Sequence, residues 1–151
     1  MTPNIYVKIF EAEGDGSQDD GTLYSLSDEF LEAAVVLQNT PPVRVNYSSA
    51  TYYLLGHSAE LMLKAFLYSH GVTIPKLKKM GHDLEKLATA STGKGLHKTV
   101  SLKQIRQLAE TYRNKSLEYR ERKKTTFPNL ELLTEEIKAL QAVVFRKICG
   151  F

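Results

Sequence analysis

The sequence predicts an all-α protein: an antiparallel up-and-down four-helix bundle with one additional short helix and an extended N-terminal arm. Four segments after residue 22 repeat apolar residues at spacings of three and four, and glycines or prolines separate them. The 151 residues are 42% hydrophobic, enough for one domain with its own core. We therefore assign residues 1–22 to an arm and linker and residues 23–151 to the helical bundle.

Residues 3–10 alternate Ile5, Val7 and Ile9 with other side chains, a pattern typical of a β-strand. A single strand has no obvious partner, so we expect an arm that lies over the bundle or is exchanged with another subunit. Residues 11–21 are acidic and glycine-rich, with too little apolar surface to fold, and we expect a flexible linker.

The first helix is expected over residues 23–39, and Thr40-Pro41-Pro42 ends it because the residue before a proline disfavours helical dihedrals. Its predicted buried face consists of Leu23, Leu26, Phe30, Ala33 and Leu37.

The second helix is expected from Arg44 or Tyr47 to His70, with Gly71 as its cap. It is apolar on more sides than one packing layer requires, which predicts a central position or a subunit interface. Two adjacent stripes run along it: Leu54, Ser58, Leu61, Ala65 and Tyr68, and Leu55, Ala59, Met62 and Phe66.

Residues 72–81 and 91–98 read as loops, on either side of a short helix that begins at His82 or Asp83 and ends near Ala90. The next helix opens with a possible capping box from Ser101 to Gln104. Its seam is Leu102, Ile105, Ala109, Tyr112, Ser116 and Tyr119, and that of the last helix, residues 129–149, is Leu130, Leu133, Ile137, Leu140, Val144 and Ile148.

Cysteine usage and hydropathy bear on location. Cys149 is the only cysteine, and the N-terminus lacks the basic start and apolar run of a signal peptide, so we expect a cytoplasmic protein. The longest apolar run, residues 33–37, is far shorter than the roughly 20 residues needed to span a bilayer. We therefore expect a soluble protein without a membrane partner.

The net charge of +3 is unevenly distributed: residues 1–33 hold one lysine and eight acids, whereas residues 94–124 hold ten basic residues and three glutamates. Arg106, Arg113 and Arg120 are seven apart and form a stripe that, with Lys115, Lys123 and Lys124, could follow phosphates. Tyr112 and Tyr119 could stack on bases. The alternative, which spacing alone favours, is a solvated face with both tyrosines in the core.

A metal centre is a weaker interpretation. His57 and Glu60 share a helix face, as do His82 and Glu85 if the short helix begins at His82, but a carboxylate and histidine centre in a bundle needs two further acids. The available ones lie beside the apolar seams, at Glu29, Glu32, Glu131 and Glu135. We expect neither a metal nor another cofactor.

Two segments carry a family resemblance: residues 59–67, with sequence AELMLKAFL, and residues 81–87, with sequence GHDLEKL, after Gly71 and a proline-containing loop. This order resembles the HEPN (higher eukaryotes and prokaryotes nucleotide-binding) domain. That family comprises helical nucleotide-binding or RNA-cleaving modules found with minimal nucleotidyltransferases and in many toxin-antitoxin and defence systems. The match covers roughly a quarter of the chain.

The resemblance also implies where a site would lie. Active HEPN members carry an arginine, often followed by asparagine, then a histidine after four to six positions, and a second subunit completes the site. Arg113 and Asn114 match the first half, but positions 118–120 hold Glu118, Tyr119 and Arg120. Histidine titrates near neutrality and arginine does not, and basic neighbours oppose the raised pKa that Glu118 would need. The resemblance therefore implies binding without cleavage.

The first hypothesis is thus a HEPN-like module that dimerises and binds RNA or a nucleotide, with a nucleotidyltransferase-like protein as a possible partner. Arg113 and Asn114 would line the dimer groove, and Arg106, Arg120, Lys123 and Lys124 would hold phosphates. The second is a metal-independent ribonuclease that uses Arg113 with an unconventional partner residue. The third is a protein-interaction or antitoxin subunit that uses the apolar excess of the second helix.

Overall fold

The computed structural model describes residues 18–114, 117 and 126–150, and this part of the chain contains helices and no strands. The predicted all-α class is confirmed. The expected strand at residues 3–10 lies outside the described residues. The helices are α2 (Asp20–Gln38), α3 (Ser48–Ser69), α4 (Ile74–Met80), α5 (Leu84–Gly93), α6 (Lys103–Arg113) and α7 (Leu130–Ile148), with a 3₁₀ turn, η1 (Leu96–Lys98).

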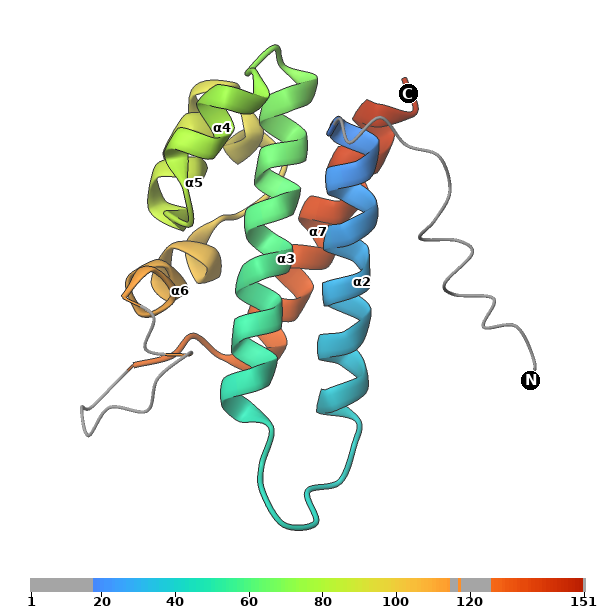
Figure 1. The fold of residues 1–151 in the computed structure, drawn as a ribbon, viewed down its shortest axis with the longest axis vertical. Helices are drawn as coiled ribbons and strands as arrows, with labels where there is room; N and C mark the ends of the chain where they lie inside the picture. The colour runs from blue at the N-terminus through green and yellow to red at the C-terminus, as the bar shows by residue number, and fades with distance from the viewer. Residues whose placement is uncertain (1–17, 115–116, 118–125, 151) are drawn as a thin grey trace.

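Helix α3 runs through the middle of the molecule (Figure 1). Helices α2 and α7 pack on it and on each other, whereas α4, α5 and α6 pack on it from the opposite side. In Figure 1, α2 runs opposite to α3, α7 runs in the same direction as α3, and α6 is seen nearly end-on. Helix α3 is therefore covered on one side by α2 and α7 and on the other by α4, α5 and α6.

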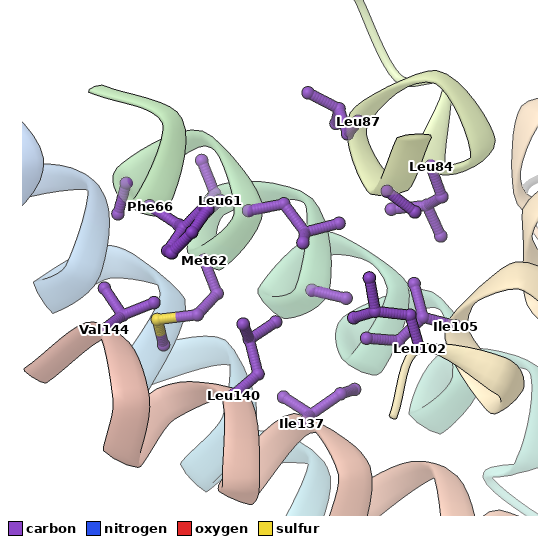
Figure 2. Packing of buried hydrophobic residues seen from close by; sticks show 14 of the residues in the cluster. Leu61, Met62, Phe66, Leu84, Leu87, Leu102, Ile105, Ile137, Leu140 and Val144 are labelled. Carbon is purple, nitrogen blue, oxygen red and sulfur yellow. The ribbon is translucent and has the colours of Figure 1, made fainter. Parts of the chain in front are cut away.

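The central position predicted for the second helix is confirmed. Leu63 and Leu67, which lie largely outside the predicted apolar stripes, are fully buried. Figure 2 shows Met62 of α3 directed toward α7 near Val144, while Leu84 of α5 and Ile105 of α6 lie on the other side of the core. Much of the apolar excess of α3 is thus buried within the chain.

The predicted face of α2 is displaced by about one residue. Leu26 is 42% exposed and Ala33 is also exposed, whereas the buried positions are Leu23, Ser27, Leu31 and Ala34. Ser27 Oγ donates to the carbonyl of Ser58 at 2.7 Å, and Ser58 Oγ donates to the carbonyl of Ser27 at 2.9 Å. Apolar spacing did not predict this face because one of its buried residues, Ser27, is polar. Its hydroxyl can be buried because the neighbouring helix satisfies its hydrogen bonds.

Two predicted loops are partly helical. Residues 74–80 form α4, which has Pro75 in its first turn and buries Leu77, and α5 extends to Gly93 before η1. Proline is favourable at the first helical positions because the N–H it lacks would have no intrahelical partner there. The proline and lysines were therefore poor indicators of a loop. At the other end of the chain, α2 begins at Asp20, within the segment predicted as linker.

The seams predicted for α6 and α7 are confirmed where they are described. The buried residues are Leu102, Ile105, Ala109 and Tyr112 near or in α6, and Leu133, Ile137, Leu140 and Val144 in α7. Ser116 and Tyr119 lie outside the described residues. The expected capping box does not form, because Gln104 N donates instead to Glu136 Oε2 of α7 at 2.7 Å. None of the described helices is long and apolar enough to cross a bilayer.

Candidate functional site: the Glu60 cluster

Glu60 is a carboxylate in the centre of the fold, with 1% of its surface exposed. Three side chains donate hydrogen bonds to it. His82 Nδ1 lies 2.7 Å and Tyr112 Oη 2.9 Å from Oε1, and Lys64 Nζ lies 2.9 Å from Oε2. A buried carboxylate is tolerated only when paired and hydrogen-bonded, and here both oxygens are. We call Glu60, Lys64, His57, His82 and Tyr112 the Glu60 cluster.

Three parts of the chain bring the cluster together. Lys64 lies one helical turn after Glu60 on α3, Tyr112 lies in the last turn of α6, and His82 lies between α4 and α5. Gly81 precedes His82 with a φ of +61°, a left-handed value that glycine adopts without strain. The turn can therefore reverse direction after α4 and place His82 against α3.

Gly56 of α3 makes room for Tyr112. A Cβ built on Gly56 would lie 2.5 Å from Tyr112 Cδ2 and 2.7 Å from Cε2, closer than non-bonded carbons approach. The missing side chain therefore lets the aromatic ring lie against the backbone of α3, with its hydroxyl at Glu60. A glycine in the middle of a helix usually lowers stability, and here it has a packing function.

Charge and hydrogen bonding set the protonation states of the cluster. Burial alone would raise the pKa of Glu60, but hydrogen bonds from His82, Lys64 and Tyr112 outweigh it, and the pKa is lowered. Burial lowers the pKa of His57, against the attraction of Glu60. The hydroxyl of Tyr112 has one proton and donates it to Glu60, so its oxygen can only accept from His57. His57 Nδ1, which lies 3.1 Å from that oxygen, is therefore the donor.

His82 connects the buried carboxylate with solvent, since its side chain is 70% exposed while its Nδ1 is held by Glu60. When Nδ1–H donates to a carboxylate, Nε2 of the neutral ring carries the lone pair. Such an oriented imidazole can accept a proton or, when protonated, donate to an anion. His82 is therefore the group of the Glu60 cluster that is best placed to meet a ligand.

Arg113, the main predicted site residue, lies close to this turn. Its Nη1 is 3.8 Å from Oδ2 of Asp83, the residue after His82, and its side chain is 58% exposed. Asn114 is the exposed C-cap of α6. Arg113 borders an open depression of about 440 Å³ that Met80, Asp83, Lys86 and Thr89 also line; we call it the Arg113 hollow. The structure thus brings His82 and Arg113 to one edge of the molecule.

Arg106, another predicted phosphate-binding residue, has its partners within the fold. Its guanidinium is paired with Glu85 and also donates to Thr89 Oγ1 at 3.2 Å and Thr92 Oγ1 at 3.3 Å. These bonds join α6 to α5 and leave the side chain poorly available for phosphates. The remaining predicted residues, Lys115, Glu118, Arg120, Lys123 and Lys124, lie outside the described residues.

Two more residues of the sequence analysis are placed by the structure. Tyr112 is 7% exposed with its hydroxyl on Glu60, which agrees with the interpretation favoured by spacing, a tyrosine in the core, and does not fit stacking on bases. His82 contacts Glu60, 22 residues away, and not the Glu85 with which it was paired on a helix face. Within the described ranges, no group of three or more histidine, cysteine or acidic side chains is arranged to hold a metal ion.

The cluster was only partly visible in the sequence. A charged residue inside an apolar run, Glu60, with Lys64 four residues later, signals a buried pair. Its pairing with His82 and Tyr112 depends on contacts between helices and has no local signal.

Comparisons with known protein families, curated proteins and solved structures found no match to this chain. The HEPN resemblance therefore rests on the residues quoted above.

Proposed function

We propose that the chain is a HEPN-like module that binds RNA or a nucleotide through phosphates at Arg113. The observation that supports this best is the position of Arg113 at the edge that also carries His82, held by Glu60. A guanidinium whose ion-pair partner, Asp83, directly follows His82 could offer several donors to phosphate oxygens together with that imidazole.

The exposure of Arg113 supports its role over that of Arg106. Its distance of 3.8 Å to Asp83 is that of a loose ion pair, and exposed pairs of this kind contribute little energy. A phosphate can therefore replace Asp83 at low cost. The sequence continues with Lys115, Arg120, Lys123 and Lys124, which would add cations to the same ligand.

The test is RNA binding by the full chain at several salt concentrations. We expect affinity to fall steeply with salt, and Arg113→Gln to weaken binding of all sequences and to reduce the salt slope by about one. Lys138→Gln is the matched control, because Lys138 is an exposed α7 lysine that pairs with Glu135 at 3.7 Å. Affinity that does not change with salt, or equal losses in both variants, would contradict the proposal.

A second candidate is the metal-independent ribonuclease, and the exposed His82 is the observation that favours it. His82 Nε2 would take the proton of a ribose 2′-hydroxyl, whose oxygen then attacks the adjacent phosphorus. The bond from phosphorus to the 5′ oxygen breaks, water supplies a proton to that oxygen, and a 2′,3′-cyclic phosphate remains. Glu60 would orient the ring, and Arg113 would stabilise charge on the phosphate.

Labelled RNA in excess chelator separates the two candidates. The ribonuclease requires cleavage by the wild type that His82→Asn and Arg113→Gln both abolish, while His82→Asn still binds RNA. If the wild type binds RNA but cleaves no faster than His82→Asn, the chain is a binding module. Chelator-sensitive cleavage would exclude this mechanism.

The homodimer, the nucleotidyltransferase-like partner and the toxin-antitoxin or defence setting remain proposals that rest on the resemblance. The third hypothesis, a protein-interaction or antitoxin subunit, depended on the apolar excess of α3, which is buried within the chain. It is therefore the least supported of the three. Light scattering at high micromolar concentration tests the dimer, and a monomeric mass would remove it from the proposal.

A further inference from the structure

A second hollow, of about 350 Å³, lies among the end of α3, the start of η1 and the last turns of α7. Its lining includes three apolar residues, Phe66, Leu96 and Val143, which we call its floor, and three basic residues, Lys94, Arg146 and Lys147. We call it the basic hollow. The C-terminal ends of α3 and α7 both lie at the top of Figure 1, well above α6. The basic hollow is therefore separate from the Arg113 hollow.

The charges around the two hollows differ. The Arg113 hollow has two acids, Asp83 and Glu85, beside Lys86 and Arg113. The basic hollow has no aspartate or glutamate in its lining. Within the described residues, none of its three cations makes a side-chain ion pair. An anion there would meet three positive charges without displacing a carboxylate.

The floor gives the hollow a second kind of contact. Phe66 and His70 have ring centroids 4.2 Å apart, and His70 Nδ1 donates to the carbonyl of Phe66 at 2.9 Å, which fixes the orientation of the imidazole. An oriented aromatic ring beside apolar side chains can pack on a flat apolar group. The volume also falls within the range of small-molecule sites, from about 300 to 1,000 Å³.

We infer that the basic hollow binds a small organic phosphate, with the phosphate on Lys94, Arg146 and Lys147 and a ring on the floor beside His70. Charge-assisted bonds from lysine and arginine are the strong contacts for phosphate oxygens, and the apolar floor makes an organic body preferable to an inorganic ion. This inference is independent of the function proposed for Arg113.

A purely structural role for the same cations predicts a different result. Arg146 and Lys147 occupy the last turn of α7, and Lys94 is the C-cap of α5. Cations at these positions stabilise a helix by interacting with the negative end of its dipole. In that case their removal would lower thermal stability and would leave ligand binding unchanged.

The experiment measures binding of ATP, adenosine and pyrophosphate to the full chain by calorimetry, with the same chain followed by amide NMR. We expect ATP to bind more tightly than either part alone, and to shift the amide signals of Gly95 and Thr99, which line the hollow. The double variant Arg146→Gln with Lys147→Gln should weaken ATP binding at least about tenfold. Lys138→Gln, a charge removal on the same helix, should change it less than about twofold.

Three results would overturn the inference. No ATP binding by the wild type, equal affinity for adenosine and ATP, or unchanged affinity in the double variant with a lower melting temperature would each do so. Loss of ATP binding in Arg113→Gln but not in the double variant would assign the ligand to the Arg113 hollow instead. RNA binding that depends on Arg113 is measured separately, so failure here leaves the proposed function standing.

Discussion

Glu60 and Glu136 are both buried carboxylates, and their surroundings give them opposite properties. Glu60 of α3 accepts hydrogen bonds on both oxygens, one from the ammonium group of Lys64. Glu136 of α7 accepts backbone N–H groups from the first turn of α6, while its Oε1 is buried with no hydrogen-bond partner among the described residues. The pKa of Glu60 is lowered, whereas burial raises that of Glu136 to about 6.

The difference shows that burial alone does not set the charge of a carboxylate. Desolvation is the first cause at both sites, and it prevails at Glu136 because two neutral amide donors cannot compensate for it. At Glu60 a cation and two further side-chain donors compensate for the same cost. The Glu60 cluster thus holds a charge that polarises His82, whereas Glu136 mainly joins two helices.

The largest effect is expected for Glu60→Ala, which leaves Lys64 with 13% exposure and no acceptor. Removing one partner of a buried pair typically costs about 3–5 kcal/mol of unfolding free energy. Chemical denaturation measures it. The double variant Glu60→Met with Lys64→Met should lose less unfolding free energy than Glu60→Ala, because neither charged side chain is left buried without its partner. A loss below about 1 kcal/mol for Glu60→Ala would show that the carboxylate is not the centre of the cluster.

The next effect is expected for Gly56→Ala, which places a methyl group against Tyr112. Alanine favours a helix over glycine by about 1 kcal/mol, yet we expect a net loss of about 1–3 kcal/mol because the ring must move away from Glu60. Gly93→Ala is the control, since Gly93 ends α5 with nothing within 4 Å of an added Cβ. Equal or higher stability of Gly56→Ala would mean that the ring moves without cost.

The two glutamates should give opposite dependences on pH. Glu136 has a folded pKa above its ordinary 4.5, so its contribution is present below pH 4.5 and is lost as pH rises through about 6. The shift corresponds to about 2 kcal/mol of unfolding free energy. Glu60 has a lowered pKa, so its contribution is present above its ordinary 4.5 and is lost as pH falls through the folded value.

Denaturation of the wild type and of Glu136→Gln from pH 4 to 8 isolates the first of these contributions. The introduced side-chain amide still accepts from Gln104 N but does not titrate. The unfolding free energy of the variant should therefore rise relative to that of the wild type as pH rises through about 6. Parallel curves for the two proteins over this range would mean that Glu136 does not titrate there.

The smallest effect is expected for Arg106→Gln. Arg106 and Glu85 form an ion pair with side chains 33% and 52% exposed. Such exposed pairs are worth about 0–1 kcal/mol, so the variant should stay within about 1 kcal/mol of the wild type in the same denaturation assay. A loss as large as that of Glu60→Ala would show that exposed pairs between α5 and α6 matter as much as the buried cluster.

Much of the fold could be predicted because helix seams are local. The spacing of Ile137, Leu140 and Val144 alone places them on one face of α7, and the apolar excess of α3 indicates a central helix. The face of α2 was missed because Ser27 and Ser58 form a polar contact that hydrophobic spacing does not register.

The candidate site was predictable in part. The sequence by itself determined that a charged residue, Glu60, stands inside an apolar helix and that Arg113 lies in a basic segment, because both facts depend only on neighbours along the chain. Only the tertiary structure decided that Glu60 holds His82 and Tyr112, that Arg106 is committed to Glu85, and that Gly56 admits an aromatic ring. These pairings join residues 21 to 56 positions apart, so they depend on how the helices pack, which no local pattern specifies.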